Sequence, residues 1–363
     1  MSRDPTVATK PQDRLRFGLV GCGRVARLRY LPIFQNFGSG RLTAVADKDP
    51  SRLEEVRRQF PKVRAFTDHQ HLLAEGEVDA LIIAIPPYLH AQAALDAIEA
   101  GIHVLVEKPF TTTLADAERV VAAAQASPVK VMVGFNRRRL PPLQQMRQLI
   151  EKGAIGRPYG GEFVHISPIT GRLGSRTGFE ADRRLGGGAL LDSCCHDLDL
   201  VRFLFGSEVT SVRCLMESRR SDDDSAWLLL TLAGGAIVSI YCGFCNFGVV
   251  GEERLLILGE EGHLRCRSSF SSVEFAPRRL GDHWWEPWRN LADYARAALW
   301  MLSKKRHWKT LSIARQLESF ILGIQQDLDP SPGVLDGLEN VRIIEAAYRS
   351  AALGGAPVLL EGH

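Results

Sequence analysis

The chain has 363 residues, of which 45% are hydrophobic, and this length exceeds that of a typical single domain. Two domains, each with its own core, are therefore expected. The 45 Lys and Arg residues nearly balance the 42 Asp and Glu residues, which argues against bulk attraction to nucleic acid or to a membrane surface. Short basic runs such as Arg137-Arg138-Arg139 are typical of solvated surfaces and name no partner.

Residues 1–14 contain neither an apolar run nor a sustained amphipathic pattern, so we expect a disordered tail without an export signal. No apolar stretch reaches membrane-spanning length, which predicts a soluble, cytoplasmic protein. The seven cysteines, an odd number, fit reduced thiols better than a disulfide framework. Cys242 and Cys245 have the spacing of a zinc knuckle, but no second pair follows, so we predict core residues and no metal site.

Between residues 15 and 136, short β-branched runs alternate with longer helical runs. This pattern is typical of βαβ units around a doubly wound parallel sheet. The predicted strands are residues 15–20, 42–46, 80–85, 102–106 and 130–133. Helices are predicted between them, including residues 91–99 and 114–126.

From residue 137 to residue 363 the pattern predicts a second, α+β domain with a mostly antiparallel sheet. Its predicted strands are residues 209–215, 227–232, 236–241 and 255–258. Its predicted helices are residues 143–152, 311–325 and 338–351, of which the last two are candidates for packing back on the first domain. The Gly- and Arg-rich residues 170–188 are predicted to form a loop.

The first predicted strand runs directly into Gly21-Cys22-Gly23-Arg24-Val25-Ala26. Glycines at this point allow a tight turn and let backbone N–H groups approach a pyrophosphate at the start of a helix. The motif alone also fits an ordinary strand-turn-helix. Its place in a βαβ unit, with Asp47 at the end of the next strand, favours dinucleotide binding.

Asp47 would accept hydrogen bonds from the ribose hydroxyls and repel a 2′-phosphate, which favours NAD. Lys48 and Arg52 lie close by in the sequence and could neutralise such a phosphate, so NADP stays possible. Asp47 also fits a simple turn residue before Pro50.

Two further groups of residues carry proton-transfer chemistry. Lys108, in Glu107-Lys108-Pro109, follows a strand at the carboxyl edge of the sheet, where ligands of α/β folds bind. A partly buried lysine there can exchange a proton during hydride transfer, although the tripeptide also fits a surface turn. Asp192 and His196 have helical spacing behind a glycine run, with Asp199 expected on the same side. They suit a proton relay, and they equally suit a helix cap or a surface pair.

With these motifs in order, the sequence resembles the Gfo/Idh/MocA family of glucose-fructose oxidoreductase and myo-inositol dehydrogenase. The resemblance covers nearly the whole chain and includes the phosphate loop and the Glu107-Lys108-Pro109 segment. It also includes the turn from Ile85 to His90, the stretch from Gly134 to Arg138, and the helix with Asp192, His196 and Asp199.

The resemblance implies a Rossmann domain and a second domain with an open, mostly antiparallel sheet, with the active site between them. It implies that Lys108 is catalytic, that the Lys108-Pro109 bond is cis, and that His196 is catalytic or orients the substrate with Asp192 as partner. It implies a cofactor pocket lined by Ile85, Pro86, His90, Glu107 and Asn136. It further implies oxidation of a secondary alcohol, or reduction of a ketone, in a sugar, cyclitol or nucleotide sugar, and assembly of a homodimer or homotetramer through the exposed sheet face.

We expect Arg137 and Asp192 to hold neighbouring substrate hydroxyls or to orient His196. Two features depart from the family pattern. Cys194 replaces a usual glycine, and residues 171–184 are rich in arginine, which suggests a hypothesis that they bind a phosphorylated or carboxylated substrate; these arginines are Arg172, Arg176, Arg183 and Arg184.

Two other functions stay open. One is a non-catalytic NAD(P)-binding regulator or scaffold, although retention of the lysine and of the Asp/His pair speaks against it. The other is a bilin or dihydrodiol type of reductase from the same superfamily. Trp284, Trp285 and Trp288 could stack on a sugar or form an interdomain or subunit contact.

Overall fold

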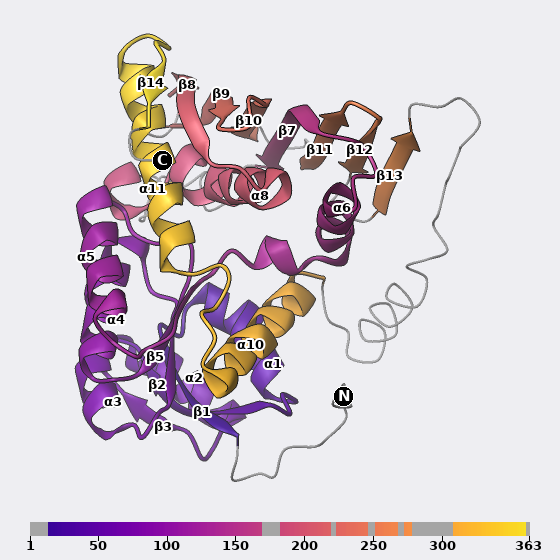
Figure 1. The fold of residues 1–363 in the computed structure, drawn as a ribbon. Helices are drawn as coiled ribbons and strands as arrows, with labels where there is room; N and C mark the ends of the chain where they lie inside the picture. Colours follow the sequence, from indigo (N-terminus) through magenta and orange to yellow (C-terminus); the bar gives the residue numbers. More distant parts are fainter. Residues whose placement is uncertain are drawn as a thin grey trace. The chain divides into compact units, whose positions relative to one another are not determined.

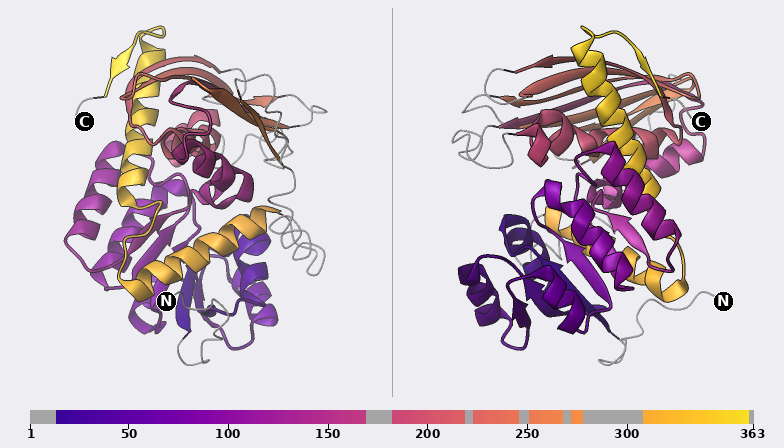
Figure 2. Two further views of the ribbon diagram at one scale, coloured as in Figure 1. Left: turned by 45° about the vertical axis from the view of Figure 1, so that its right-hand side comes forward. Right: turned by 90° about the vertical axis from the view of Figure 1, so that its left-hand side faces the viewer.

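The computed structural model describes residues 14–168, 182–218, 223–245, 251–267, 272–277 and 308–360. Their contacts divide the chain into two compact units (Figures 1 and 2). Of the described residues, unit 1 contains 14–110, 115–134 and 309–335, and unit 2 contains the others. Apart from Arg14, the predicted N-terminal tail lies outside the described residues. In the part of the chain that the structure describes, no helix is long and apolar enough to cross a membrane.

Unit 1 is built on a six-stranded parallel sheet in the order β3-β2-β1-β4-β5-β6. The strands are β1 (Leu15–Val20), β2 (Gly40–Ala46), β3 (Arg64–Phe66), β4 (Ala80–Ile83), β5 (His103–Val106) and β6 (Val131–Val133). The central strands are apolar along their length because helices cover both faces of such a sheet. The predicted doubly wound sheet is confirmed. The order reverses between β1 and β4, and this switch point is where open α/β sheets bind ligands.

Helices connect these strands, and Figure 1 shows α3, α4 and α5 stacked along one side of unit 1. Asp49 caps α2 by accepting a hydrogen bond from the backbone N–H of Ser51, and Asp68 caps α3 by accepting one from Gln70. The helical segments of unit 1 are η2 (Ala26–Tyr30), α1 (Leu31–Phe34), α2 (Pro50–Gln59), α3 (His69–Glu75), η3 (Pro87–Leu89), α4 (His90–Glu99), α5 (Leu114–Gln125) and α10 (Trp308–Gln326).

Unit 2 is built on an eight-stranded sheet in the order β13-β12-β11-β7-β10-β9-β8-β14. Strands β7 and β10 are parallel, and the other described neighbours are antiparallel, so the predicted mostly antiparallel sheet is confirmed. The strands are β7 (Pro158–Pro168), β8 (Val209–Glu217), β9 (Ser225–Leu232), β10 (Ile237–Cys245), β11 (Glu252–Gly259), β12 (Gly262–Arg267), β13 (Ser272–Pro277) and β14 (Val358–Leu359).

One face of this sheet is packed and the other is exposed. Along β9, Leu228 and Leu230 are buried, whereas Trp227 and Leu229 are exposed, as expected for alternating residues of a strand. Figure 2 shows α8 on the covered face of the sheet. The helical segments of unit 2 are η4 (Asn136–Arg139), α6 (Pro141–Glu151), η6 (Arg183–Leu185), η7 (Ala189–Cys194), α8 (Cys195–Phe205) and α11 (Val334–Ala352).

Candidate active site

The loop after β1 has the shape of a phosphate cradle. Gly21 has a φ of +92°, and a Cβ there would lie 2.4 Å from the carbonyl oxygen of Ala84, so only glycine fits. A Cβ on Gly23 would meet nothing nearer than Arg52 Nη1 at 3.9 Å, so the loop leaves open space on this side. Residues from Arg24 onward turn directly into helix, with Ala26 buried at the start of η2. An open loop at a helix start fits a pyrophosphate group.

Asp47 stands at the end of β2, beside this loop. Its Oδ2 accepts a hydrogen bond from the backbone N–H of Cys22 at 2.7 Å, and its Oδ1 accepts one from Asp49 at 2.9 Å. Arg52 Nη1 lies 3.5 Å from Oδ2. Asp47 therefore does serve the turn, and its interaction with a ribose stays a prediction. Burial raises the pKa of the Cys22 thiol to about 12, so this side chain is an uncharged part of the loop.

His90 links the segments that follow β4 and β5. It is completely buried, with Nδ1 2.8 Å from the carbonyl oxygen of Pro109 and Nε2 3.0 Å from that of Ile85. Burial lowers the pKa of His90, while the two carbonyl groups favour its protonated form. Ile85 in turn approaches the phosphate loop, because a Cβ on Gly21 would lie 2.9 Å from its Cγ2. Pro86 follows Ile85 and precedes η3.

Lys108 follows β5 at the carboxyl edge of the same sheet and is partly exposed. The Lys108-Pro109 peptide bond is cis, which confirms the expectation drawn from the resemblance. Glu107 is buried, and its carboxylate accepts a hydrogen bond from the hydroxyl of Tyr30. The phosphate loop and the lysine thus lie at the same edge of unit 1.

In unit 2, Asp192 lies in the π-helical segment η7 and His196 lies in the first turn of α8. Both side chains are partly exposed. Asp199 is completely buried and is bonded to Arg138 at 2.6 and 2.9 Å. The π-helical segment ends at Cys194, so it changes the helical phase between Asp192 and the residues of α8, whereas His196 and Asp199 both lie in α8. The expectation that Asp199 acts together with Asp192 and His196 stays a prediction.

Arg137 lies in a buried cluster of charged side chains from four elements. Its Nη1 is 3.2 Å from Asp197 on α8, and its Nη2 is 2.9 Å from Glu253 on β11. His165 on β7 completes the cluster, with Nδ1 2.9 Å from Asp197 Oδ2. Arg137 and Arg138 are both buried, so the interpretation of this basic run as a solvated surface is wrong. Asn136 begins the same segment, η4.

His165 and Glu253 were not predicted from the sequence. They are isolated polar residues in strands, and the antiparallel register of β7 and β11 places them opposite each other. No local signal in the sequence identified them, because the burial of Arg137, which requires acidic partners, is visible only in the structure.

The arginine-rich segment is described only from residue 182 onward. Arg183 lies over the ring of Tyr348, 5.2 Å from its centroid, and Arg184 forms an ion pair with Asp182 at 2.9 Å. The other two arginines, Arg172 and Arg176, and the three tryptophans Trp284, Trp285 and Trp288 lie outside the described residues.

The cysteines near His196 belong to the core. Cys194 is completely buried, and its hydrogen bond with Cys242, together with burial, raises the pKa of its thiol. Cys242 itself is buried, and its thiol points to the carbonyl oxygen of Ala189 at 3.6 Å. The side chain of Cys245 lies outside the described residues. Among the residues that the structure describes, no group of three or more His, Cys, Asp or Glu side chains is arranged to hold a metal ion.

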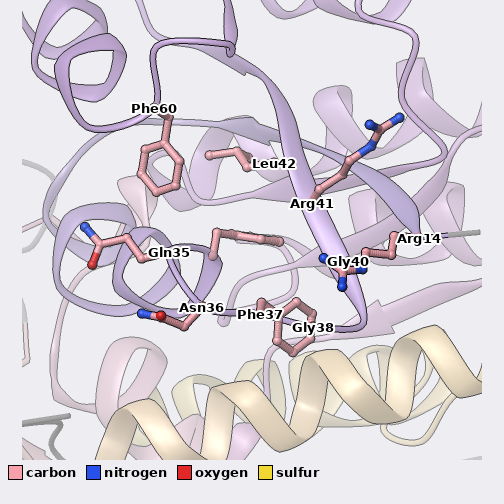
Figure 3. Close-up of a pocket in the computed structure, with 10 residues that line it drawn as sticks. Arg14, Gln35, Asn36, Phe37, Gly38, Gly40, Arg41, Leu42 and Phe60 are labelled. Carbon is pink, nitrogen blue, oxygen red and sulfur yellow. The ribbon is translucent and has the colours of Figure 1, made fainter. Parts of the chain in front are cut away.

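A pocket of about 420 Å³ opens elsewhere in unit 1, at the amino ends of β1 and β2 (Figure 3). Phe37 and Phe60 line it, with Arg14 and Asn36 also on its wall. The guanidinium of Arg41 points away from Phe60 (Figure 3). Since open α/β sheets bind ligands at the carboxyl ends of their strands, this pocket is not the candidate active site.

Comparisons with known proteins agree with this geometry. Residues 15–135 match the family model for an oxidoreductase family with an NAD-binding Rossmann fold, and residues 143–265 match the GFO/IDH/MocA C-terminal domain. An inositol 2-dehydrogenase of Rhizobium meliloti (strain 1021) is 30% identical over 352 residues, which cover 93% of this chain and 97% of that protein. A D-apiose dehydrogenase of Paraburkholderia graminis is 25% identical over 96% of this chain and 91% of its own length.

Among solved structures, the WlbA dehydrogenase from Bordetella pertussis, in complex with NADH and UDP-GlcNAcA, is similar. It superposes with a TM-score of 0.84 at 26% identity, over 96% of this chain and 99% of that chain. Two matched domains and full-length relatives at this identity establish descent, and the chain belongs to the Gfo/Idh/MocA family of NAD-binding oxidoreductases.

Proposed function

We propose that the protein oxidises a secondary alcohol of a sugar or cyclitol, or reduces the corresponding ketone, with NAD as the hydride carrier. The observation that supports this most directly is the carboxyl edge of the sheet in unit 1. There the open loop at Gly23 follows β1, and Lys108 follows β5 of the same sheet. The names of the relatives, an inositol 2-dehydrogenase and a D-apiose dehydrogenase, support the substrate class.

The proposed cofactor site uses the loop and the segments around it. The cradle accommodates a pyrophosphate, and Asp47 is the hydrogen-bond acceptor for a ribose. When bound, NAD supplies the acceptor for a hydride from the carbinol carbon. The residues that we propose to hold it are Gly21, Cys22, Gly23, Arg24, Val25, Ala26, Asp47, Ile85, Pro86, His90, Glu107 and Asn136.

The residues of the chain itself must manage the proton of the hydroxyl group, because hydride loss from a carbinol carbon produces a ketone only if the oxygen also loses its proton. We assign this proton to Lys108 of unit 1 and His196 of unit 2. Asp192 orients His196 or holds a neighbouring hydroxyl. Arg137 is tied to Asp197 and Glu253, so its proposed contribution is to shape the substrate pocket through this cluster and to offer a fixed guanidinium to a hydroxyl.

A panel of cyclitols, aldoses and nucleotide sugars, assayed by the absorbance of NADH, tests the proposal. Lys108→Ala and His196→Ala should each lose about 10²–10⁴-fold in kcat, the usual contribution of a positioned proton-transfer group. Both should still bind NADH in a calorimetric titration. Lys62→Ala, which removes an exposed lysine of unit 1, is the matched control and should turn over normally. Near-normal turnover by Lys108→Ala would contradict the assignment.

An acidic nucleotide sugar is a second candidate within this substrate class. The WlbA dehydrogenase was solved with UDP-GlcNAcA, and Arg183 in this chain lies six positions before Ala189, the first residue of η7. A guanidinium there could bind a phosphate or carboxylate. Arg183→Gln should then raise KM for an acidic nucleotide sugar and leave KM for a neutral cyclitol unchanged. The same KM for the acidic nucleotide sugar in the variant and in the wild type would exclude this candidate.

We also propose that a second copy of the chain covers the exposed sheet face of unit 2. Leu215, Trp227 and Tyr241 lie in one cross-strand row there, and the rings of Trp227 and Tyr241 are in contact, with 5.0 Å between centroids and their planes tilted by 40°. Such a contiguous apolar row is typical of a subunit interface. Light scattering should show a dimer or tetramer, and Trp227→Lys should shift it toward the monomer; an unchanged mass for the variant would count against this interface.

A further inference from the structure

Glu107 is a charged residue in the interior of unit 1, directly before Lys108. Only 7% of the residue is exposed. Its Oε1 accepts a hydrogen bond of 2.5 Å from the hydroxyl of Tyr30, and its Oε2 lies 3.3 Å from the backbone N–H of Lys108. Each oxygen of the carboxylate therefore faces a donor, the Tyr30 hydroxyl on one side and the backbone N–H of Lys108 on the other.

Tyr30 gives this carboxylate a connection to the phosphate loop. It is the last residue of η2, the helical segment that follows the loop, and its side chain is completely buried. Burial and the neighbouring carboxylate raise the pKa of Tyr30 well above its ordinary value, so the hydroxyl stays protonated and donates. An O–H that points at a carboxylate also offsets part of its negative charge.

The groups that act on the Glu107 carboxyl come from two segments. Burial raises its pKa, whereas the Tyr30 hydroxyl, Lys108 and Arg29 favour the ionised form. Arg29 and Tyr30 lie on η2, and Lys108 adjoins β5. A carboxylate beside a lysine stabilises the protonated ammonium, because opposite charges at short range favour each other.

We infer that Glu107 is a positioning residue that sets the protonation of Lys108, with Tyr30 adjusting the strength of that effect. The inference rests on the proposed function, in which Lys108 exchanges a proton with the substrate hydroxyl. Glu107 does not touch the reacting atoms. The Glu107 carboxylate stabilises the protonated form of Lys108. Tyr30 weakens this effect, because its hydroxyl donates a hydrogen bond to the same carboxylate and offsets part of its negative charge.

The two contacts of Glu107 predict shifts of opposite sign in the pH at which Lys108 releases its proton. Glu107→Gln removes the charge while keeping an oxygen for the Tyr30 hydroxyl, so Lys108 should release its proton about one pH unit lower, near the low end of the range for a neighbouring charge. Tyr30→Phe leaves the carboxylate uncompensated, so Lys108 should release its proton at a higher pH, with a smaller shift. Damage to the fold would not produce opposite signs.

The experiment is the pH dependence of lysine acetylation by acetic anhydride in the full chain, followed by mass spectrometry of the peptides that contain Lys108 and Lys62. Only the neutral amine reacts, so the midpoint of the rate reports its protonation. The midpoint of Lys108 should fall in Glu107→Gln and rise in Tyr30→Phe, while that of exposed Lys62 stays constant in both. If Glu107→Gln does not fold, Tyr30→Phe alone decides: a midpoint that falls or does not move overturns the inference.

Turnover gives a second readout. In the direction of alcohol oxidation, the rising limb of kcat against pH should move with the Lys108 midpoint in each variant. If Glu107→Gln lowered kcat by the same factor at every pH, without moving the rising limb of the profile, Glu107 would have only a structural role. The labelling needs neither cofactor nor substrate. A wild-type chain that turns over no substrate would therefore defeat the proposed function, whereas an active enzyme with an unmoved Lys108 midpoint in Glu107→Gln would defeat this inference.

Discussion

Gly188 is the position where a single methyl group should do most damage to the candidate site. It has a φ of +89° and directly precedes the π-helical segment Ala189–Cys194, which carries Asp192. A Cβ there would lie 1.5 Å from Asp223 Oδ1, far inside van der Waals contact. Asp223 is completely buried, and its Oδ2 accepts hydrogen bonds from the Tyr348 hydroxyl at 2.9 Å and the Leu190 N–H at 3.2 Å.

The free energy of unfolding should therefore fall for two reasons in Gly188→Ala. The backbone conformation costs a non-glycine residue about 1–3 kcal/mol. Displacing Asp223 also breaks two hydrogen bonds to a charged group, each worth about 1.5–3 kcal/mol. Gly235→Ala is the matched control in the same unit, because Gly235 has a φ of +81° and a Cβ there would meet nothing within 4 Å. The control should lose only the backbone contribution, so Gly188→Ala should be about 3–6 kcal/mol less stable than Gly235→Ala.

Urea unfolding followed by circular dichroism measures this difference, and kcat on the best substrate of the panel measures its effect on the site. Gly188→Ala should lose activity even in conditions where it is folded, because Asp223 and the N–H of Leu190 fix the first turn of η7. Equal stability and equal kcat in the two alanine variants would refute the reasoning that Asp223 holds this segment in place.

Three other results are expected. Arg52 lies 3.5 Å from Asp47, so Arg52→Ala should lower kcat/KM for NADP about tenfold and change that for NAD little, as steady-state kinetics with each cofactor will show. Burial raises the pKa of Asp199 to about 6, against about 4 in an unfolded chain. Between these pH values the folded state binds more protons than the unfolded state, so the contribution of Asp199 to the free energy of unfolding falls as pH rises. Asp199→Asn lacks this titration, so its urea midpoint should decline less between about pH 4 and pH 6 than that of the wild type. Arg137→Met leaves the buried carboxylate of Asp197 without its guanidinium and should cost about 3–5 kcal/mol in urea unfolding.

The elements of unit 1 were predictable because each strand is a short apolar run between helices with a clear period. The strand at Arg64–Phe66 was not predicted, since three residues with an exposed arginine carry no pattern. In unit 2, β7 (Pro158–Pro168) was missed for a different reason. It contains two adjacent glycines, and His165 on its covered face is a polar residue whose burial depends on partners from other elements.

The candidate site likewise contains residues that a local sequence pattern predicts and residues that no local pattern predicts. The phosphate loop and Lys108 are local motifs at the ends of predicted strands, and their places in the sheet follow from the parallel order. Contacts between distant segments carry no such local signal. The hydrogen bond between Tyr30 and Glu107 joins residues 77 positions apart, and the ion pair between Arg137 and Glu253 joins residues 116 positions apart. Such pairs become visible only when the sheet register and the helix packing are known.

The basic run in η4 shows why these distant pairs matter for the site. Consecutive arginines face two aspartates that are two positions apart on α8: Arg137 bonds to Asp197, and Arg138 bonds to Asp199. His196 directly precedes the first of these aspartates, so the two buried ion pairs hold the turn on which it stands. A buried ion pair contributes little net stability compared with an apolar contact, but its geometry is demanding, because a misplaced partner leaves a charge without compensation. The pairs therefore act by restricting α8 to one position against η4, and the proton-transfer role that we propose for His196 requires this restriction more than it requires additional stability.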